Sequence, residues 1–106
     1  MRFDGSDLKG ADLSSANLSG SSFRNADLSG CNLGSSNFTG CSFIRAHLDK
    51  ADLTHSSFVG ADFTEATLTD ANFTNSKISG AVFEKADLTR TNIQMVDGAG
   101  AAERPW

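Results

Sequence analysis

Large apolar residues recur at every fifth position along nearly the whole chain. Starting at Phe3 and stepping by five, this register runs to Ile93 without interruption and contains nineteen large apolar residues. Every Phe and every Leu lies in it, and two positions before each member stands a smaller residue, usually Ala, Ser or Cys. A five-residue period fits neither an α-helix nor a continuous strand, so the chain must turn once within each repeat.

Each repeat is predicted to be a three-residue strand followed by a corner. We call the large apolar residue of a repeat its centre. The centre and the small residue two positions before it are expected to point inward, and the residue between them outward. That outward residue is usually Asp, Asn or Ser, as in Ala11-Asp12-Leu13. The next two positions form the corner, and the second of them is Gly seven times, which suits the positive φ of a type II turn.

A second period, of twenty residues, predicts how many repeats complete one coil. Every fourth centre is Phe in one column and Leu in the next; the Phe column is Phe3, Phe23, Phe43, Phe63 and Phe83. Charges twenty residues apart alternate in sign, as in Lys50, Asp70 and Arg90, which suits neighbours stacked ~4.8 Å apart. Nineteen repeats at four per coil predict an all-β, four-sided solenoid of about 4.75 coils with 20 residues each.

These repeats resemble those of the pentapeptide-repeat family, whose consensus is A(D/N)LXX. The resemblance covers residues 1–95 and is carried by segments such as Ala16-Asn17-Leu18 and Ala26-Asp27-Leu28. It implies a right-handed quadrilateral β-helix. The best-known activity of the family is inhibition or protection of type II DNA topoisomerase by an acidic rod that resembles duplex DNA. We expect a single β-helix of residues 1–95 and a tail of residues 96–106, in which Trp106 either caps the last coil or is loosely held.

Composition and charge exclude several classes of protein. No apolar run approaches the ~18 residues of a membrane span, and the first ten residues contain no apolar stretch typical of a secretory signal. The net charge is -4, which argues against direct binding to a nucleic-acid backbone. Cys31 and Cys41 lack the spacing of a zinc or redox motif and occupy small inward positions. We therefore expect a cytoplasmic protein, without membrane contact, whose thiols are buried and unreactive.

The sequence offers no candidate catalytic, cofactor or metal site. The unbroken register leaves no inserted loop, and a narrow solenoid fills its own interior, so no cleft is expected. His47 falls at an outward position and His55 at a corner, and neither has the partners of a metal site or a catalytic triad. We expect a non-catalytic scaffold that binds an unknown protein partner.

Acidic residues are in excess on two neighbouring sides of the predicted solenoid, the sides centred on Leu8 and Leu13. Seven acids stand there against Lys9, Lys50 and Arg90, which leaves a net charge of -4. These acids form a candidate interaction surface, the acidic ridge: Asp7, Asp12, Asp27, Asp49, Asp52, Asp70 and Asp87. A duplex of the same length, ~23 Å, would carry about thirteen charges. The acidic ridge, with a net charge of -4, falls far below that density, so a DNA-mimicking modulator of DNA gyrase, related to quinolone resistance proteins, is kept as the alternative function.

The ends of the predicted solenoid expose unpaired strand edges. Met1 already occupies the first small inward position, so nothing in this sequence caps the first coil. Solenoids normally need caps, and an open edge favours pairing with another chain. We expect end-to-end association of two copies through these edges.

Overall fold

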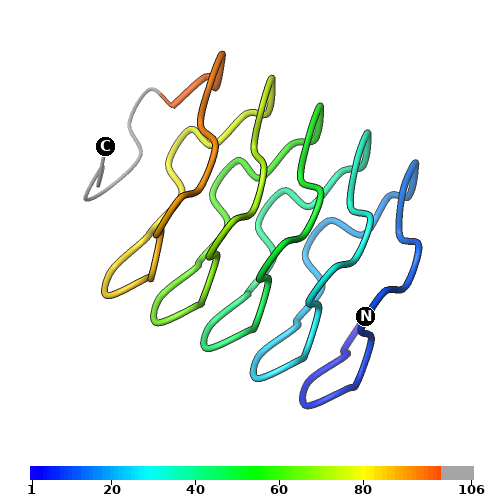
Figure 1. Cartoon of the computed structure of the whole chain (residues 1–106). Helices are drawn as coiled ribbons and strands as arrows, with labels where there is room; N and C mark the ends of the chain where they lie inside the picture. The colour runs from blue at the N-terminus through cyan, green and yellow to red at the C-terminus, as the bar shows by residue number, and fades with distance from the viewer. Residues whose placement is uncertain (99–106) are drawn as a thin grey trace.

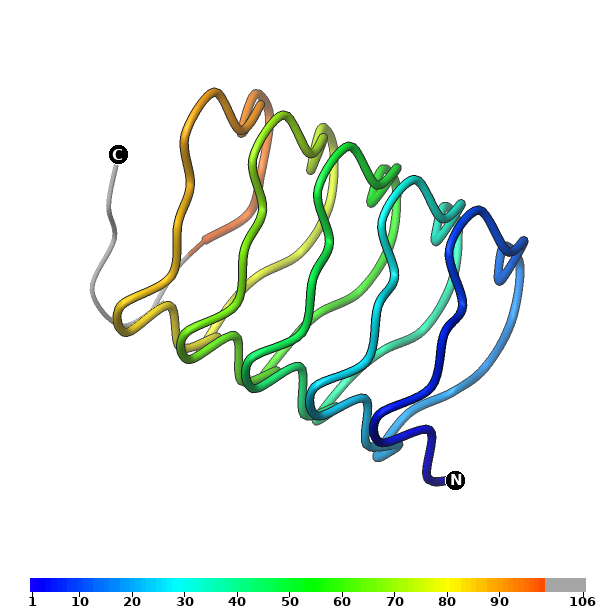
Figure 2. The same ribbon diagram turned by 60° about the horizontal axis from the view of Figure 1, so that its bottom comes forward.

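The computed structural model describes residues 1–98, which wind into a right-handed quadrilateral β-helix (Figure 1). Each strand contributes a single bridging residue, and sixteen parallel bridges join residue n to residue n+20, from Arg2↔Ser22 to Lys77↔Asp97. The described residues contain no helix. The predicted all-β solenoid with 20 residues per coil is therefore confirmed. Figure 2 shows the coils stacked in one direction, with Met1 and the last described coil at opposite ends.

The four sides of the solenoid are numbered here by the centres of the first coil. Side 1 is centred on Phe3, side 2 on Leu8, side 3 on Leu13 and side 4 on Leu18. The ladder continues two residues past position 95, because the N–H of Ile78 donates to the carbonyl oxygen of Asp97 at 2.7 Å. The expected Trp106 cap lies outside the described residues.

Each corner turns through one residue in the left-handed region of backbone space. Every fifth residue from Gly5 to Met95 has a positive φ, and seven of these residues are Gly. At most corners the N–H of the following small residue donates to the preceding centre, as Ala26 does to the carbonyl oxygen of Phe23 at 3.1 Å. Positive φ at the second corner position is what the glycines predict, and twelve other residues adopt it as well.

The outward Asp and Asn residues hold the corners in shape. The Oδ1 atom of Asp52 accepts hydrogen bonds from the N–H of Thr54, at 3.0 Å, and from its hydroxyl, at 2.7 Å. The same pair of bonds occurs at Asp12, Asp62, Asn72 and Asp87. The N–H of the second corner residue donates to the next coil, as His55 does to the carbonyl oxygen of Thr74, whereas the N–H of the first corner residue is satisfied by the acceptor two residues earlier. The consensus preference for Asp or Asn is thus first a structural one.

Stacked apolar columns fill the interior. Phe43 lies between Phe23 and Phe63, with ring centroids 5.1 and 4.9 Å apart and planes tilted by 4° in both pairs. The centres of coils two to four are fully buried, whereas Leu8 and Leu88, in the first and last coils, are only partly buried. A coil at either end has one neighbour instead of two, and this halves the cover over its centres.

Candidate functional site

The interior of residues 1–98 is packed with apolar side chains, and most polar side chains lie on the outer surface. The apolar side chains pack into one continuous core cluster, and within residues 1–98 no group of three His, Cys, Asp or Glu could hold a metal ion. No helix of the described segment is long and apolar enough to cross a membrane.

The two histidines stand apart from each other. His47 lies on side 2, with its Nδ1 atom 3.2 Å from the hydroxyl oxygen of Thr67. His55 lies at the corner between sides 3 and 4, with its Nε2 atom 3.3 Å from Nδ2 of Asn75. His47 lies beside a hydroxyl and His55 beside an amide, and neither ring forms an ion pair within residues 1–98, so neither has the carboxylate partner of a catalytic triad.

Cys31 and Cys41 are buried, free thiols, which confirms their predicted inward placement. The Sγ atom of Cys31 donates to the carbonyl oxygen of Leu8 at 2.8 Å, and that of Cys41 donates to the carbonyl oxygen of Leu18 at 3.0 Å. Burial raises the pKa of both thiols above the ordinary value of 9.0. A higher pKa leaves less thiolate at neutral pH, so these groups are poor nucleophiles.

The acidic ridge is largely occupied with internal contacts. The carboxylates of Asp12, Asp27, Asp52 and Asp87 each accept a hydrogen bond from the backbone N–H two residues later. Hydrogen bonds from Ser14 lower the pKa of Asp12, and hydrogen bonds from Thr89 lower that of Asp87, so both remain ionised at neutral pH. The ridge therefore keeps its charge, while one oxygen of each of these four carboxylates is already committed.

Cations of the same sides also offset part of the ridge. The guanidinium of Arg90 binds Asp70 through two hydrogen bonds, of 2.7 and 3.1 Å, and this contact lowers the pKa of Asp70. The Nζ atom of Lys9 lies 3.8 Å from the carboxylate of Asp27. The acidic ridge is therefore moderately negative, and its charge is offset locally at Asp70 and Asp27.

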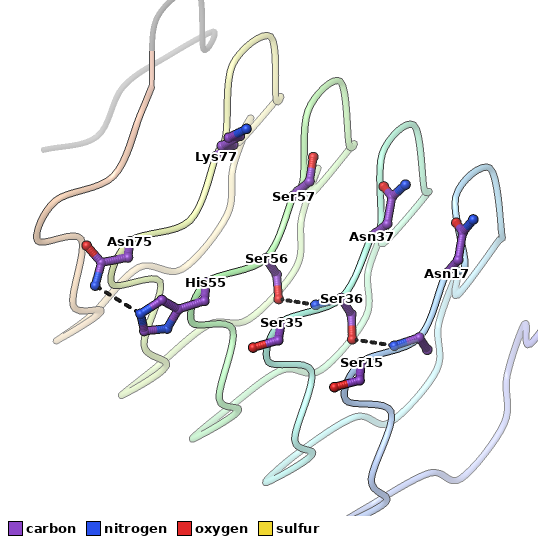
Figure 3. A pocket seen from close by; sticks show the side chains of 11 residues that line it. Ser15, Asn17, Ser35, Ser36, Asn37, His55, Ser56, Ser57, Asn75 and Lys77 are labelled. Atoms are coloured by element: carbon purple, nitrogen blue, oxygen red, sulfur yellow. Dashed lines mark hydrogen bonds between the residues drawn. The ribbon is translucent and has the colours of Figure 1, made fainter.

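A groove of about 410 Å³ follows the corner between sides 3 and 4, and we call it the corner groove (Figure 3). One wall is the second corner position of side 3, with Ser15, Ser35, His55 and Asn75 in successive coils. The other wall is the outward column of side 4: Asn17, Asn37, Ser57 and Lys77. Ser36 and Ser56 lie between the two walls, and Ala16 also lines the groove.

Buried serines open this corner. The N–H of Ser36 donates to Oγ of Ser56 at 3.0 Å, instead of to the carbonyl oxygen of Leu33. The Oγ of Ser56 in turn donates to that carbonyl at 2.6 Å. Ala16 and Ser36 are joined in the same way, with the Ala16 N–H 3.0 Å from Oγ of Ser36. At this corner a serine hydroxyl is inserted into the turn hydrogen bond, which distinguishes it from the other corners. We call the serines that supply these hydroxyls the serine ladder: Ser36, Ser56 and Ser76.

Sequence reasoning missed the corner groove. The usable signal is Ser at 36, 56 and 76, recurring every 20 residues at a position where most other columns have Ala. Inward serines also occur elsewhere, at Ser21 for example, so the signal is visible only once the period is combined with the corner geometry.

Comparison with known proteins identifies relatives of this fold. The family model described as pentapeptide repeats matches residues 2–34, 31–70 and 66–97. A pentapeptide-repeat protein of the Arabidopsis thaliana thylakoid lumen is 32% identical with a TM-score of 0.75; the match covers 93% of this chain and 66% of that one. A pentapeptide-repeat protein of the cyanobacterium Cyanothece 51142 is 26% identical with a TM-score of 0.85, covering 88% and 64%.

The match to QnrB1, a plasmid-mediated fluoroquinolone resistance protein, is more distant. It has 22% identity and a TM-score of 0.53, and covers 94% of this chain and 57% of QnrB1, so it shows the fold alone. The chain spans less than two thirds of each of these three structures. No curated protein sequence matches the chain.

Proposed function

This chain belongs to the pentapeptide-repeat family, and from that premise we propose that it is a non-catalytic scaffold that binds another protein through its outer surface. The observation that carries the proposal is the division of the side chains. Nearly all large apolar residues fill the interior, and the exposed columns consist mainly of Asp, Asn, Ser and Thr held at a fixed spacing by the coils. A rigid polar surface without a closed cavity suits recognition rather than turnover.

Two surfaces are candidates for the contact, the acidic ridge and the corner groove. The ridge presents net negative charge on sides 2 and 3 and would suit a basic partner. The groove presents uncharged hydrogen-bonding groups and Lys77. They lie on different parts of the outer surface, so variants can test them separately.

The test is affinity capture followed by binding of the purified partner. The wild-type chain is immobilised, captured proteins are identified, and each is purified and titrated against the wild type and two variants. One variant neutralises two acids of the ridge, Asp12→Asn with Asp52→Asn, whose amide oxygens can still accept the corner N–H as that of Asn32 does, and the other alters the groove, Lys77→Gln. Saturable binding that one variant weakens and the other does not supports an interaction scaffold. If no captured protein, once purified, binds the wild-type chain saturably, the scaffold proposal is wrong.

Modulation of DNA gyrase is the second candidate function. Its support is the concentration of seven acids on two adjacent sides, together with a fold that a fluoroquinolone resistance protein shares. The hydrogen-bonded and ion-paired carboxylates of the ridge weigh against close mimicry of a duplex. A gyrase supercoiling assay decides between the two candidates. Inhibition, or rescue of activity in the presence of a quinolone, that the double ridge variant abolishes would establish gyrase as the target.

A further inference from the structure

The side 4 wall of the corner groove presents hydrogen-bond donors. The Oδ1 atom of Asn37 accepts the N–H of Thr39 at 3.0 Å, and that of Asn17 accepts the N–H of Ser19 at 3.3 Å. Because each amide oxygen is held by its corner, each Nδ2 group remains for an external acceptor. The corner hydrogen bond thus fixes not only the turn but also which end of the amide is available.

Lys77 continues this column in the fourth coil and adds a positive charge. Its side chain is exposed and forms no ion pair within residues 1–98. An ammonium group has three donors and no acceptor. Side 4 carries no acidic residue in the first four coils, and Asp97 follows only in the fifth. Ser57, between Asn37 and Lys77, shares a hydrogen bond of 2.9 Å with the hydroxyl of Thr39, so the donors of this wall are the amides of Asn17 and Asn37 and the ammonium group of Lys77.

The serines between the walls are already satisfied. The hydroxyl of Ser36 donates to the carbonyl oxygen of Leu13 at 2.8 Å and accepts the N–H of Ala16, and Ser56 makes the equivalent bonds one coil later. They leave no unpaired group for a ligand, so recognition falls to the walls. Asp12 and Asp52 of side 3 do not line the groove.

The length of the groove limits the size of its ligand. Four coils span three intervals of ~4.8 Å, or roughly 14 Å, which corresponds to about four or five residues of extended chain at ~3.3 Å each. An extended peptide also offers unpaired carbonyl oxygens at its edges, which match a wall of donors.

We propose that the corner groove binds a short, extended, acidic peptide segment of the partner protein, with one carboxylate at Lys77 and carbonyl or carboxylate oxygens at Asn17 and Asn37. The proposal rests on the interaction function above and names the surface and the chemistry of the partner. It assigns recognition to the groove rather than to the acidic ridge, which would repel the same segment.

Fluorescence polarisation with labelled penta-glutamate, penta-glutamine and penta-lysine peptides tests the chemistry. We expect saturable binding of penta-glutamate, weakened by salt, and at least fivefold weaker binding of the other two peptides. Lys77→Gln should weaken penta-glutamate binding at least fivefold. Lys85→Gln is its matched control, because Lys85 is also exposed but lies at the diagonally opposite corner, between sides 1 and 2. Equal effects of the two substitutions, or no binding of penta-glutamate, would overturn the proposal.

Asn37→Asp tests the donor wall without disturbing the corner. A carboxylate can still accept the N–H of Thr39, as Asp52 accepts that of Thr54, but the Nδ2 donors are replaced by a negative charge. We expect at least fivefold weaker binding, whereas Asn32→Asp, in the same coil on side 3, should change affinity less than twofold. Asp97→Asn should tighten binding, because it removes the acid that follows Lys77 in the column.

Failure of this proposal is distinguishable from failure of the scaffold function. If a purified partner binds the Lys77→Gln variant normally but not the double ridge variant, the scaffold function stands and the groove assignment is wrong. If wild-type protein binds penta-glutamate with ¹H–¹⁵N shift changes at the side-chain amides of Asn17 and Asn37, the groove assignment stands. Shift changes confined to other sides would reject it.

Discussion

Ser56 donates its hydroxyl hydrogen to the carbonyl oxygen of Leu33, 2.6 Å away and one coil below. The Oγ atom of Ser56 also accepts the N–H of Ser36 at 3.0 Å, so one buried hydroxyl replaces the direct turn hydrogen bond between the N–H of Ser36 and the carbonyl oxygen of Leu33. Above Ser76 the equivalent residue is Val96, which has no hydroxyl, and there the N–H of Ser76 donates to the carbonyl oxygen of Phe73 at 2.9 Å. The presence of the hydroxyl thus accompanies the open form of the corner.

Replacement of the buried hydroxyl should destabilise the fold. Ser56→Ala removes the alternative partner of one N–H and one C=O, which then must re-form the closed turn or remain unpaired. We expect a loss of about 1–3 kcal/mol in the free energy of unfolding, measured by chemical denaturation. Ser19→Ala is the control, since Ser19 is exposed, and it should change stability by less than about 0.5 kcal/mol. Equal stability of the two variants would show that the inserted hydroxyl contributes nothing.

Most of the fold could be predicted from the sequence because its determinants are periodic. The Phe column predicts that Phe43 stacks between Phe23 and Phe63, and the rings do so. The corner glycines predict positive φ, but the same conformation at Arg45 or Glu65 follows only from the register, since these residue types have no preference for it. The hydrogen bonds by which Asp and Asn hold the corners could not be predicted from the sequence pattern. The pattern indicates only that these residues are outward and polar, which suits a binding role equally well.

The candidate site was harder to predict than the fold. The seven acids of the acidic ridge could be placed on their sides by counting, but the hydrogen bond from the N–H of Thr54 to the carboxylate of Asp52 depends on a corner conformation that composition does not reveal. The corner groove depends on whether the N–H of Ser36 donates to Leu33 or to Ser56. Ser56 is twenty residues away in the sequence, so this choice of acceptor becomes visible only when the coils are stacked.

Both cysteines should resist alkylation in the folded protein. Their side chains are buried, and burial raises the pKa of each thiol, so access and thiolate fraction are both low. We expect no modification of Cys31 or Cys41 by iodoacetamide at pH 7.5 in native buffer, and complete modification of both in denaturant, measured by mass spectrometry. Rapid native labelling of either thiol would show that the coil around it opens.

Acid should destabilise the β-helix. Hydrogen bonds, mainly from serine and threonine hydroxyls, backbone N–H groups and Arg90, lower the pKa of five carboxyls below the ordinary 3.8: Asp4, Asp12, Asp27, Asp70 and Asp87. A depressed pKa in the folded state stabilises the fold above the unfolded pKa, and this stabilisation is lost as the pH falls through the folded value. The Tm should therefore be steady from pH 7 to about 5 and fall below about 4.

Asp12→Asn isolates one of these carboxyls. The amide oxygen can still accept the N–H of residue 14, as Asn32 accepts that of Gly34 at 2.9 Å, but it does not titrate. The variant should have a slightly lower Tm than the wild type at pH 7, because it lacks the stabilising charge, and should lose less Tm on acidification. A Tm that rises between pH 4 and pH 2 would contradict the assigned direction of the pKa shifts.

The Phe column should be most sensitive at its middle. Phe43 is fully buried between two stacked rings, whereas Phe3 is only partly buried and stacks on Phe23 alone. We expect Phe43→Ala to cost about 3–5 kcal/mol in the free energy of unfolding and Phe3→Ala clearly less. Denaturant titration followed by circular dichroism measures both. A cost at Phe3 equal to that at Phe43 would mean that the ends are as tightly packed as the centre.

The corner at Gly60 separates backbone strain from steric fit. Gly60 has a φ of +68°, and a Cβ atom added there would meet nothing within 4 Å, so Gly60→Ala changes only the conformational preference. We expect a loss of about 1 kcal/mol in the free energy of unfolding. The reverse change at an equivalent corner, Glu65→Gly, should be neutral or stabilising, because the φ of 59° at Glu65 is unfavourable for a side chain and costs glycine nothing.

Gly34→Ser is the control, since the corresponding corner residue one coil below is Ser14 and Gly34 has no positive φ. Measured by the same denaturant titration, a larger loss at Gly34 than at Gly60 would mean that crowding by Asn32, whose Oδ1 lies 3.1 Å from the added Cβ, outweighs backbone strain at these corners.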